Sequence, residues 1–463
     1  MKKSITRREL LEQVGQITLA ASLPTIPVDA EAANLFSGQN ERPEPSDWFA
    51  GDPHVHRGIG CGRSNAKEML PPRQLLEMMK PNNLAVVSVL SDIGNGEIKY
   101  ANQDMPLITG QDDPASTSQR ILHWDAEWHY DPEGVTFQKK VIGGHLVLLG
   151  LKRGGKPFAE YTYPIIEWAR KQGAIAGFAH MQYLPYGLYP PPDGIPLSLD
   201  CCAPLEYPVE IALGTASFVE EDVHGRDSAI HGYYRLLNCG FRPGLAGATD
   251  YPCNYMEPLG TCLTFVRIPD GKLTYRKWIR GIAKGRTVVS RIGHNEFLDL
   301  KVNGTAQPGD EVRVAGKGPV HVRIEWRSLK KATGRIELVH NGAVVASQTS
   351  SVTPGAPVIF EIMVEFRQSG WLAARRMDWQ NGHQTATGGV FVIVKELPIR
   401  ASASDAEFFA QWIDNLIRQT SPGGAWSKFF PEQREAAQAR YREARAVFQE
   451  RAREAQNQAA SNP

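Results

Sequence analysis

Residues 84–90 read Leu-Ala-Val-Val-Ser-Val-Leu, a nearly unbroken run of apolar and small side chains. Such a run is typical of a β-strand that is buried on both faces. Three more segments have the same character, at residues 141–151, 174–179 and 243–249. Amphipathic stretches at residues 165–172 and 227–237 predict helices between them. Strands that alternate with helices imply parallel pairing, and therefore an α/β barrel or a doubly wound sheet.

A different pattern begins near Phe297. Six short segments largely alternate apolar and polar residues, at residues 298–302, 312–314, 320–326, 335–339, 358–362 and 389–395. Asn303-Gly304 and Asn341-Gly342 are typical of hairpin turns. This region therefore predicts a β-sandwich. Residues 405–419 and 431–456 predict two helices, and the second has so few large apolar residues that we expect it to be largely solvated.

Composition limits the classes of partner. The 463 residues are too many for one ordinary core. Because 51 basic residues face 50 acidic ones, the formal charge is only +1, which argues against nucleic acid and anionic lipid as partners. No segment approaches the ~18 consecutive apolar residues of a membrane anchor. A small-molecule substrate is the expected partner, and the oligomeric state stays open.

The N-terminus has the features of an export signal. Arg7-Arg8 precedes apolar residues, a modest apolar stretch follows at residues 17–28, and Ala30-Glu31-Ala32 offers small residues at the spacing of a cleavage site. This pattern resembles a twin-arginine signal and predicts a periplasmic or secreted protein. An amphipathic N-terminal helix is the alternative.

The motif with the clearest chemistry is Gly-Asp-Pro-His-Val-His at residues 51–56. His54 and His56 occupy alternate positions of an extended segment, so both imidazoles point to the same side and can bind one ion. Histidines of this kind also serve as hydrogen-bonding residues of a core, so the pair alone is weak evidence. In an α/β barrel, the carboxyl ends of the strands converge at one mouth. His180 and Asp250 each end an apolar segment, whereas His145 begins one and fits this placement least well.

Together these motifs resemble the PHP domain, the polymerase and histidinol phosphatase family of metal-dependent hydrolases. Within it they are similar to the CehA/McbA branch of carbamate and aryl ester hydrolases. The resemblance spans residues 48–293 and extends to residues 335–344 and 405–413. It implies an α/β fold with a distorted (β/α)7 barrel, followed by a β-sandwich-like domain and a C-terminal helical tail. The predicted organisation is a signal peptide (1–33), a linker (34–47), the hydrolase domain (48–293), the β-sandwich-like domain (294–398) and the tail (399–463).

The resemblance also implies roles for individual residues. His54, His56 and Asp250 would hold a first metal, and Glu127 would bridge it to a second metal that His145 and His180 complete. Glu127 and Asp250 are the residues assigned to catalysis. Nitrogen and oxygen ligands of this kind suit zinc, manganese or iron.

The chain departs from the family at three places. Where many members have Thr-Asp-His, it reads Ser91-Asp92-Ile93, and the closing Asp-x-His reads Asp250-Tyr251-Pro252. A histidine expected within residues 57–64 is also absent. Because these are ligands of a third metal, we predict two ions. Asp52 and Asp92 are then predicted to accept hydrogen bonds from the imidazoles and orient them, with direct ligation as the alternative.

Two divalent ions that share a water lower its pKa, so the ligand set predicts hydrolysis by a metal-activated water. An ester or carbamate substrate is favoured, because the third metal that would help hold a phosphate is missing. Nearby aromatic residues suit a flat or apolar substrate: Trp124, Trp128, Tyr183, Tyr186 and Tyr189. A phosphoesterase acting on a small phosphorylated compound and a noncatalytic exported binding protein are the alternatives. His123, His129 and His224 are candidate general acids, with a structural role as the alternative for each.

Overall fold

The computed structural model describes residues 42–57, 69–95, 101–130, 144–179, 181, 204–221, 228–253, 258–378 and 382–460. Residues 42–463 belong to one compact unit. Some predictions fall outside the described residues: the signal peptide at residues 1–33, His180, His224, Tyr183, Tyr186 and Tyr189.

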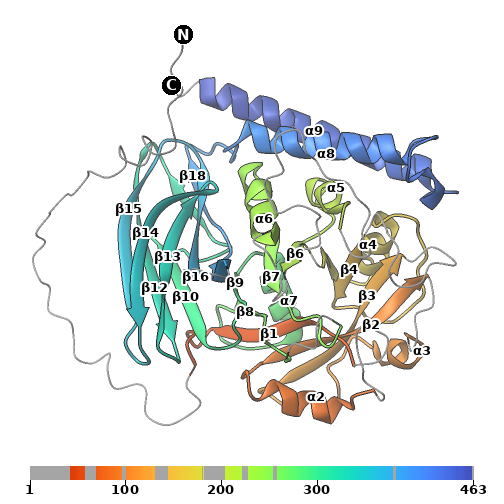
Figure 1. Cartoon of the computed structure of the whole chain (residues 1–463), viewed down its shortest axis with the longest axis horizontal. Coiled ribbons are helices and arrows are strands. Elements are labelled where there is room, and N and C mark those ends of the chain that lie inside the picture. The colour runs from red at the N-terminus through yellow and green to blue at the C-terminus, as the bar shows by residue number, and fades with distance from the viewer. Residues whose placement is uncertain are drawn as a thin grey trace, which may run out of the picture. The chain divides into compact units, whose positions relative to one another are not determined.

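A curled sheet carries the first half of the chain (Figure 1). Its strands are β1 (Trp48–Val55), β2 (Val86–Asn95), β3 (Ile121–Tyr130), β4 (His145–Leu149), β5 (Ile175–Phe178), β6 (Phe218–Glu221), β7 (Gly244–Gly247), β8 (Leu263–Arg267) and β9 (Thr287–Ser290). They are hydrogen-bonded in the order β9-β8-β1-β2-β3-β4-β5-β6-β7. The sheet curls back on itself, because the Gly247 amide on β7 donates to Thr264 Oγ1 on β8 at 2.8 Å.

Short helices connect these strands. They are α2 (Pro72–Met79), α3 (Ala101–Asp104), η2 (Met105–Leu107), α4 (Tyr163–Arg170), α5 (Tyr207–Ala212), α6 (Ser228–Asn238) and α7 (Tyr275–Ala283). Thr274 caps α7 by accepting a hydrogen bond from the Lys277 amide. The buried face of α7 carries Trp278 and Ile282, which join Phe218 of β6 in one apolar core. Helix α7 therefore packs against the face of the sheet to which Phe218 points.

The C-terminal strands form two layers. A three-stranded sheet contains β10 (Glu296–Val302), β12 (Gly318–Ser328) and β15 (Val358–Phe366). The others extend the large sheet: β11 (Glu311–Val314), β13 (Ala332–His340), β14 (Ala343–Val352), β16 (Gly370–Asp378), β17 (Gly382–Thr387) and β18 (Val390–Val394). A separate apolar core lies between the layers and includes Trp326 of β12, Leu338 of β13 and Val392 of β18.

The predicted distorted (β/α)7 PHP-type barrel is wrong. Such a barrel needs parallel strands, whereas β4 runs antiparallel to both β3 and β5. The sheet also continues from β9 through β17 into the C-terminal strands, which makes one mixed sheet of 15 strands. Strands on both sides of residue 293, the predicted end of the first domain, therefore belong to this sheet. The apolar runs located strands but not their directions, because a strand buried on both faces reads the same either way.

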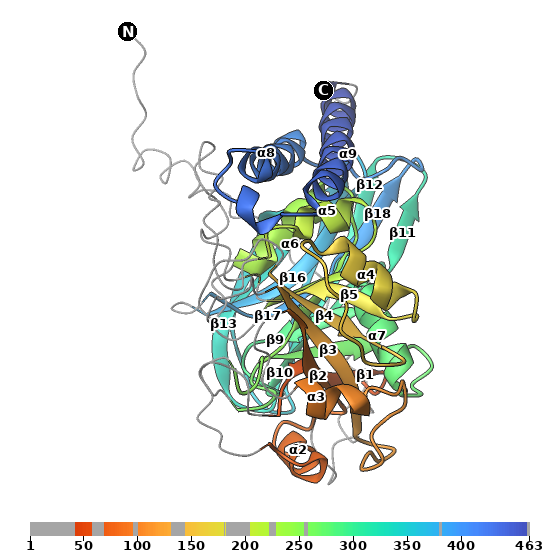
Figure 2. The ribbon, with the colours of Figure 1, turned by 90° about the vertical axis from the view of Figure 1, so that its right-hand side faces the viewer.

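Two C-terminal helices lie side by side, α8 (Ala403–Thr420) and α9 (Arg434–Ala460), with η4 (Ser427–Phe429) between them in sequence (Figures 1 and 2). They occupy the two segments predicted to be helical. α9 is mostly solvated, but one stripe of its side chains is buried. In this stripe, the ring centroid of Phe448 lies 5.0 Å from that of Phe409 of α8. None of the described helices is long and apolar enough to cross a membrane.

Candidate metal centre

Three parallel strands bring polar side chains to one edge of the sheet. β1 contains His54 and ends just before His56, β2 contains Asp92, and β3 contains Glu127 and His129. Because β1, β2 and β3 run parallel, their carboxyl ends lie at the same edge. Asp92 and Glu127 are paired neighbours across β2 and β3.

Two other strands complete this edge. β4 is antiparallel to β3, so its first residue, His145, lies directly opposite His129 at the end of β3. Asp250 follows β7, where the His56 amide donates to the Tyr251 carbonyl oxygen at 2.6 Å. The reversed strand direction thus explains how a residue at the beginning of an apolar segment reaches the site. His180, the remaining predicted ligand, is outside the described residues.

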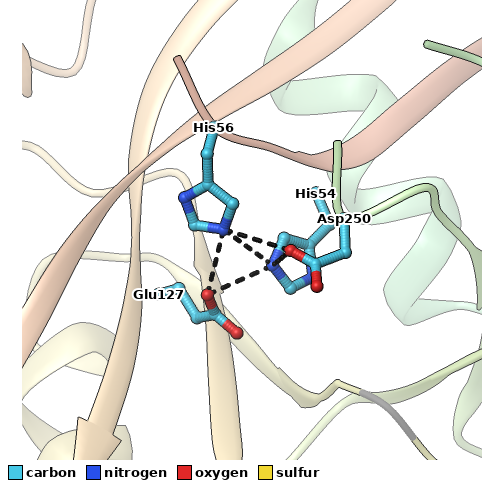
Figure 3. Close-up of side chains that lie close together, drawn as sticks. All are labelled: His54, His56, Glu127 and Asp250. Carbon is cyan, nitrogen blue, oxygen red and sulfur yellow. Dashed lines mark hydrogen bonds and ion pairs between the residues drawn. The ribbon is translucent and has the colours of Figure 1, made fainter. Parts of the chain in front are cut away.

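A first group consists of His54, His56, Glu127 and Asp250, all buried (Figure 3). His54 Nε2 lies 3.2 Å from His56 Nε2, 3.2 Å from Glu127 Oε2 and 3.3 Å from Asp250 Oδ1. His56 Nε2 lies 3.1 Å from Glu127 Oε2 and 3.4 Å from Asp250 Oδ1. Four ligand atoms from three separate parts of the chain therefore converge on one point.

These separations suit atoms that bind one ion. With metal–ligand distances of ~2.0–2.1 Å and bond angles of ~90–110°, two such atoms lie ~2.8–3.4 Å apart. The five separations above lie between 3.1 and 3.4 Å. Two imidazoles and two carboxylates are also a donor set that divalent metals accept. The buried cluster can therefore hold a metal ion.

A second group consists of Glu127, His129 and His145. The two oxygens of Glu127 face different groups, because Oε1 lies 2.8 Å from His145 Nδ1 while Oε2 faces His54 and His56. His129 Nε2 lies 3.1 Å from Glu127 Oε2. The sequence prediction gave His129 only a general-acid or structural role. Its position two residues after Glu127, on the same face of an extended segment, was the available signal.

Each histidine of the first group has an acceptor behind it. His54 Nδ1 lies 2.9 Å from Glu220 Oε1, and His56 Nδ1 lies 3.2 Å from the Leu90 carbonyl oxygen. A carbonyl accepts only from a protonated Nδ1, so His56 turns Nε2 toward the centre, and this atom offers a lone pair to a metal once it has lost its proton. The same arrangement at His54 uses a buried carboxylate. Glu220, on β6, was not predicted from the sequence.

Asp52 holds the backbone of the site rather than an imidazole. Its Oδ1 accepts from the amides of His54 and Thr249, both at 3.2 Å, and its Oδ2 accepts from Thr249 Oγ1 at 2.5 Å. Burial raises the pKa of Asp52 to about 7, against the effect of the hydrogen bonds from Thr249 and His54. Asp250, next to Thr249, has a φ of 51°, a left-handed conformation that aspartate adopts more readily than most residues. Asp52 therefore ties β1 to the loop that presents Asp250.

Asp92 does contact imidazoles. Its Oδ1 lies 3.1 Å from His129 Nε2 and 3.5 Å from His56 Nδ1. This position suits the predicted orienting role. Close approach of β2 and β3 here depends on Gly94, whose φ is 134° and where a Cβ atom would lie 1.9 Å from the His129 carbonyl oxygen.

The carboxylates dominate the electrostatics of the site. Burial by itself lowers the pKa of His56, but the charge of Asp92 and hydrogen bonds to Asp250 and Glu127 outweigh it and raise the pKa to about 10. Burial likewise opposes the carboxylates around His54, which hold its pKa well above 6.5. Burial raises the pKa of Glu127, yet the charges of His54, His129 and His145 hold it well below 4.5. Without metal, these carboxylates therefore favour the protonated imidazoles of His54 and His56 at neutral pH.

Metal affinity is expected to rise with pH. A metal ion binds only neutral imidazole, so binding must displace the proton that His56 keeps below a pKa of about 10. Lowering the pH favours the proton, so affinity should fall about tenfold per pH unit for each proton displaced, between pH 9 and 7. Competition of the metal-free protein with a chromophoric chelator would measure this, after correction for protonation of the chelator. An affinity that does not change with pH would contradict it.

The remaining candidates lie away from the two groups. His123 stacks on Tyr275 with ring centroids 3.7 Å apart, and its Nδ1 lies 2.9 Å from Asp112 Oδ1. Trp124 and Trp128 are buried and alternate with Glu127 along β3, so they point to the opposite face of the strand. They consequently give no support to an aromatic substrate pocket.

Comparison with models of protein families finds no match, and comparison with curated proteins finds none either. Among solved structures, part of the chain is similar to the CARDB domain of the PF1109 protein from Pyrococcus furiosus in complex with di-metal ions. The identity is 15%, with 22% of this chain and 96% of that chain covered and a TM-score of 0.16. A superoxide reductase (neelaredoxin) from Ignicoccus hospitalis is similar at 19% identity, covering 21% of this chain and 82% of that chain, with a TM-score of 0.14. TM-scores this low support no inference about this chain.

Proposed function

We propose that the chain is a hydrolase with two metal ions that acts on an ester or carbamate through a metal-activated water. The observation that carries this proposal is the shared carboxylate of Glu127. Its Oε2 belongs to the group of His54, His56 and Asp250, and its Oε1 faces His145. A carboxylate that faces two ligand groups in this way suits a pair of neighbouring ions.

When bound, such ions supply an activated water and polarise the scissile carbonyl. The residues of the chain would hold these ions in position. Glu127 sets the distance between the two groups. Asp250 completes the first group, because its Oδ1 faces the Nε2 atoms of both histidines. Among the described residues, the first group has four candidate ligands and the second has three. Among the described side chains of the two groups and their partners, those of Asp92 and Asp250 are the most exposed, at 16% and 11%. Substrate is therefore expected to approach from their side.

Charge balance favours an uncharged substrate. Among the described residues, four carboxylates lie in or directly beside the two groups: Asp92, Glu127, Glu220 and Asp250. Two divalent ions would just neutralise them, leaving no surplus positive charge for a phosphate dianion. Arg57, which follows His56 directly, is already paired with Asp104 and lies over the Trp124 ring. An ester or carbamate needs no such charge.

Substrates that share one leaving group would test this proposal. We expect protein reconstituted with zinc, manganese or iron(II) to hydrolyse a nitrophenyl ester or carbamate faster than the nitrophenyl phosphate. Metal-free protein should be at least ~100-fold slower, because the water would lose its activation. Faster turnover of the phosphate would identify a phosphoesterase. Tight metal binding without turnover of any of the three would favour the noncatalytic binding protein.

Export and family membership are part of the same proposal. Cys253 is disulfide-bonded, as expected in an oxidising compartment such as the periplasm. The relation to the PHP family, and to its CehA/McbA branch, rests on the sequence motifs and the ligand set. The mixed sheet gives it no support, because its strand directions differ from the expected barrel.

A further inference from the structure

Glu220 is a buried carboxylate with only one of its two oxygens bonded. It lies near the end of β6 and is 0% exposed. Its Oε1 lies 2.9 Å from His54 Nδ1, while Oε2 has no hydrogen-bond partner among the described residues. Leaving a buried carboxylate oxygen unbonded costs stability. A neutral side chain would avoid this cost, so packing alone does not explain a glutamate here.

The contact with His54 gives the carboxylate a specific role. When Nδ1 carries the proton and donates it to Glu220, Nε2 keeps its lone pair and points it at the centre shared with His56 and Glu127. A carboxylate partner also makes the imidazole a stronger electron donor to a metal than a carbonyl partner does. His56, whose partner is the Leu90 carbonyl oxygen, lacks this second effect. The two histidines of the first group are therefore unequal ligands.

We propose that Glu220 is a positioning residue that fixes the ring and tautomer of His54 and strengthens its bond to the metal. The inference rests on the metal-binding part of the proposed function and does not depend on the substrate. It also places β6 among the strands that build the centre, although β6 contributes none of the four ligands of the first group.

The neighbouring Glu221 provides a matched control. It lies on the same strand and is equally buried, at 0%. Successive residues of a strand point to opposite faces, and Glu221 bonds His383 of β17 through both oxygens, at 2.9 and 3.1 Å. Replacing either glutamate by glutamine removes one buried charge from β6, but only Glu220 touches a candidate ligand.

The test compares E220Q with E221Q in zinc binding, measured by chelator competition on the full chain. We expect E220Q to bind zinc about 10- to 100-fold more weakly, the usual cost of losing an outer partner of a metal ligand. E221Q should stay within about twofold of the wild type, because its hydrogen bonds go to His383 and not to the centre. Thermal unfolding of the metal-free proteins shows whether both variants fold.

Equal losses in the two variants, or wild-type affinity in E220Q, would overturn the proposal. If E220Q does not fold, the zinc-loaded wild type answers the question through ¹⁵N NMR of its histidine rings, with H54Q used for assignment. His54 must then carry its proton on Nδ1, and a proton on Nε2 would also overturn the proposal. Because zinc affinity is measured without any substrate, a failure of the ester hydrolase proposal would leave this result intact.

Discussion

The E127Q variant is expected to lose metal from both positions and to hydrolyse ester substrates at less than about one hundredth of the wild-type rate. Glu127 is the one residue common to both ligand groups. Glutamine keeps one carbonyl oxygen but carries no charge and cannot offer two equivalent oxygens. Losing even an outer partner of a ligand costs ~10- to 100-fold in affinity, so losing the bridging ligand should cost more.

Single-group variants distinguish a shared ligand from a general loss of structure. H145A should lower the metal content of the second position only, and H54A that of the first, because each histidine belongs to one group. H321A serves as the control, since His321 lies on β12 among the C-terminal strands. Metal would be counted per chain by mass spectrometry after gel filtration. If E127Q keeps one full equivalent of metal, the bridging role is wrong.

Local sequence patterns and the family resemblance together found most of the described candidate site. His54 and His56 lie two residues apart in an extended segment, so one strand places both imidazoles together. Asp250 and Glu127 followed from the family resemblance, and the structure brings both to the same point. His145 also reaches the site, although the expected parallel sheet offered no reason for it. The antiparallel direction of β4, which no local pattern encodes, supplies that reason.

Contacts between residues that are distant in the sequence could not be predicted from local patterns. Glu220 is 166 residues from His54, and nothing in the sequence around β6 links the two. Asp52 was predicted to accept a hydrogen bond from an imidazole. It bonds Thr249 instead, 197 residues away, because β1 lies beside the loop that follows β7. Such contacts depend on which strands and loops lie side by side, and no local pattern encodes that.

β3 shows why the fold was harder to predict than the site. Its sequence, Ile-Leu-His-Trp-Asp-Ala-Glu-Trp-His-Tyr, alternates tryptophan and alanine with charged residues and histidines. Such alternation is normally expected of a strand with one face in water. Here the polar face is buried as well, because Asp125, Glu127 and His129 all point into the curled sheet. The burial of Glu127 and His129 reflects the site, whereas Asp125 accepts from the Gly150 and Leu151 amides and the Tyr275 hydroxyl.

Replacing Arg376 by methionine is expected to destabilise the protein by about 3–5 kcal/mol, the usual cost of leaving one partner of a buried ion pair without the other. Arg376 of β16 donates to Glu296 of β10, with Nη2 2.8 Å from Oε2 and Nε 2.9 Å from Oε1. Their side chains are only 5% and 1% exposed. Trp326 and Thr385 also donate to Glu296, so one carboxylate joins the three-stranded sheet to the large sheet.

R323M provides the comparison for this effect. Arg323 pairs with Glu361 on the three-stranded sheet, but these side chains are 34% and 47% exposed, so its loss should cost no more than about 1 kcal/mol. Urea unfolding of the metal-free proteins would compare the variants without stabilisation by bound metal. Adding E296Q to R376M should recover part of the loss, since it removes the unpaired charge. If R376M costs no more than R323M, the two sheets are not held together by this carboxylate, and their packing depends on the apolar core alone.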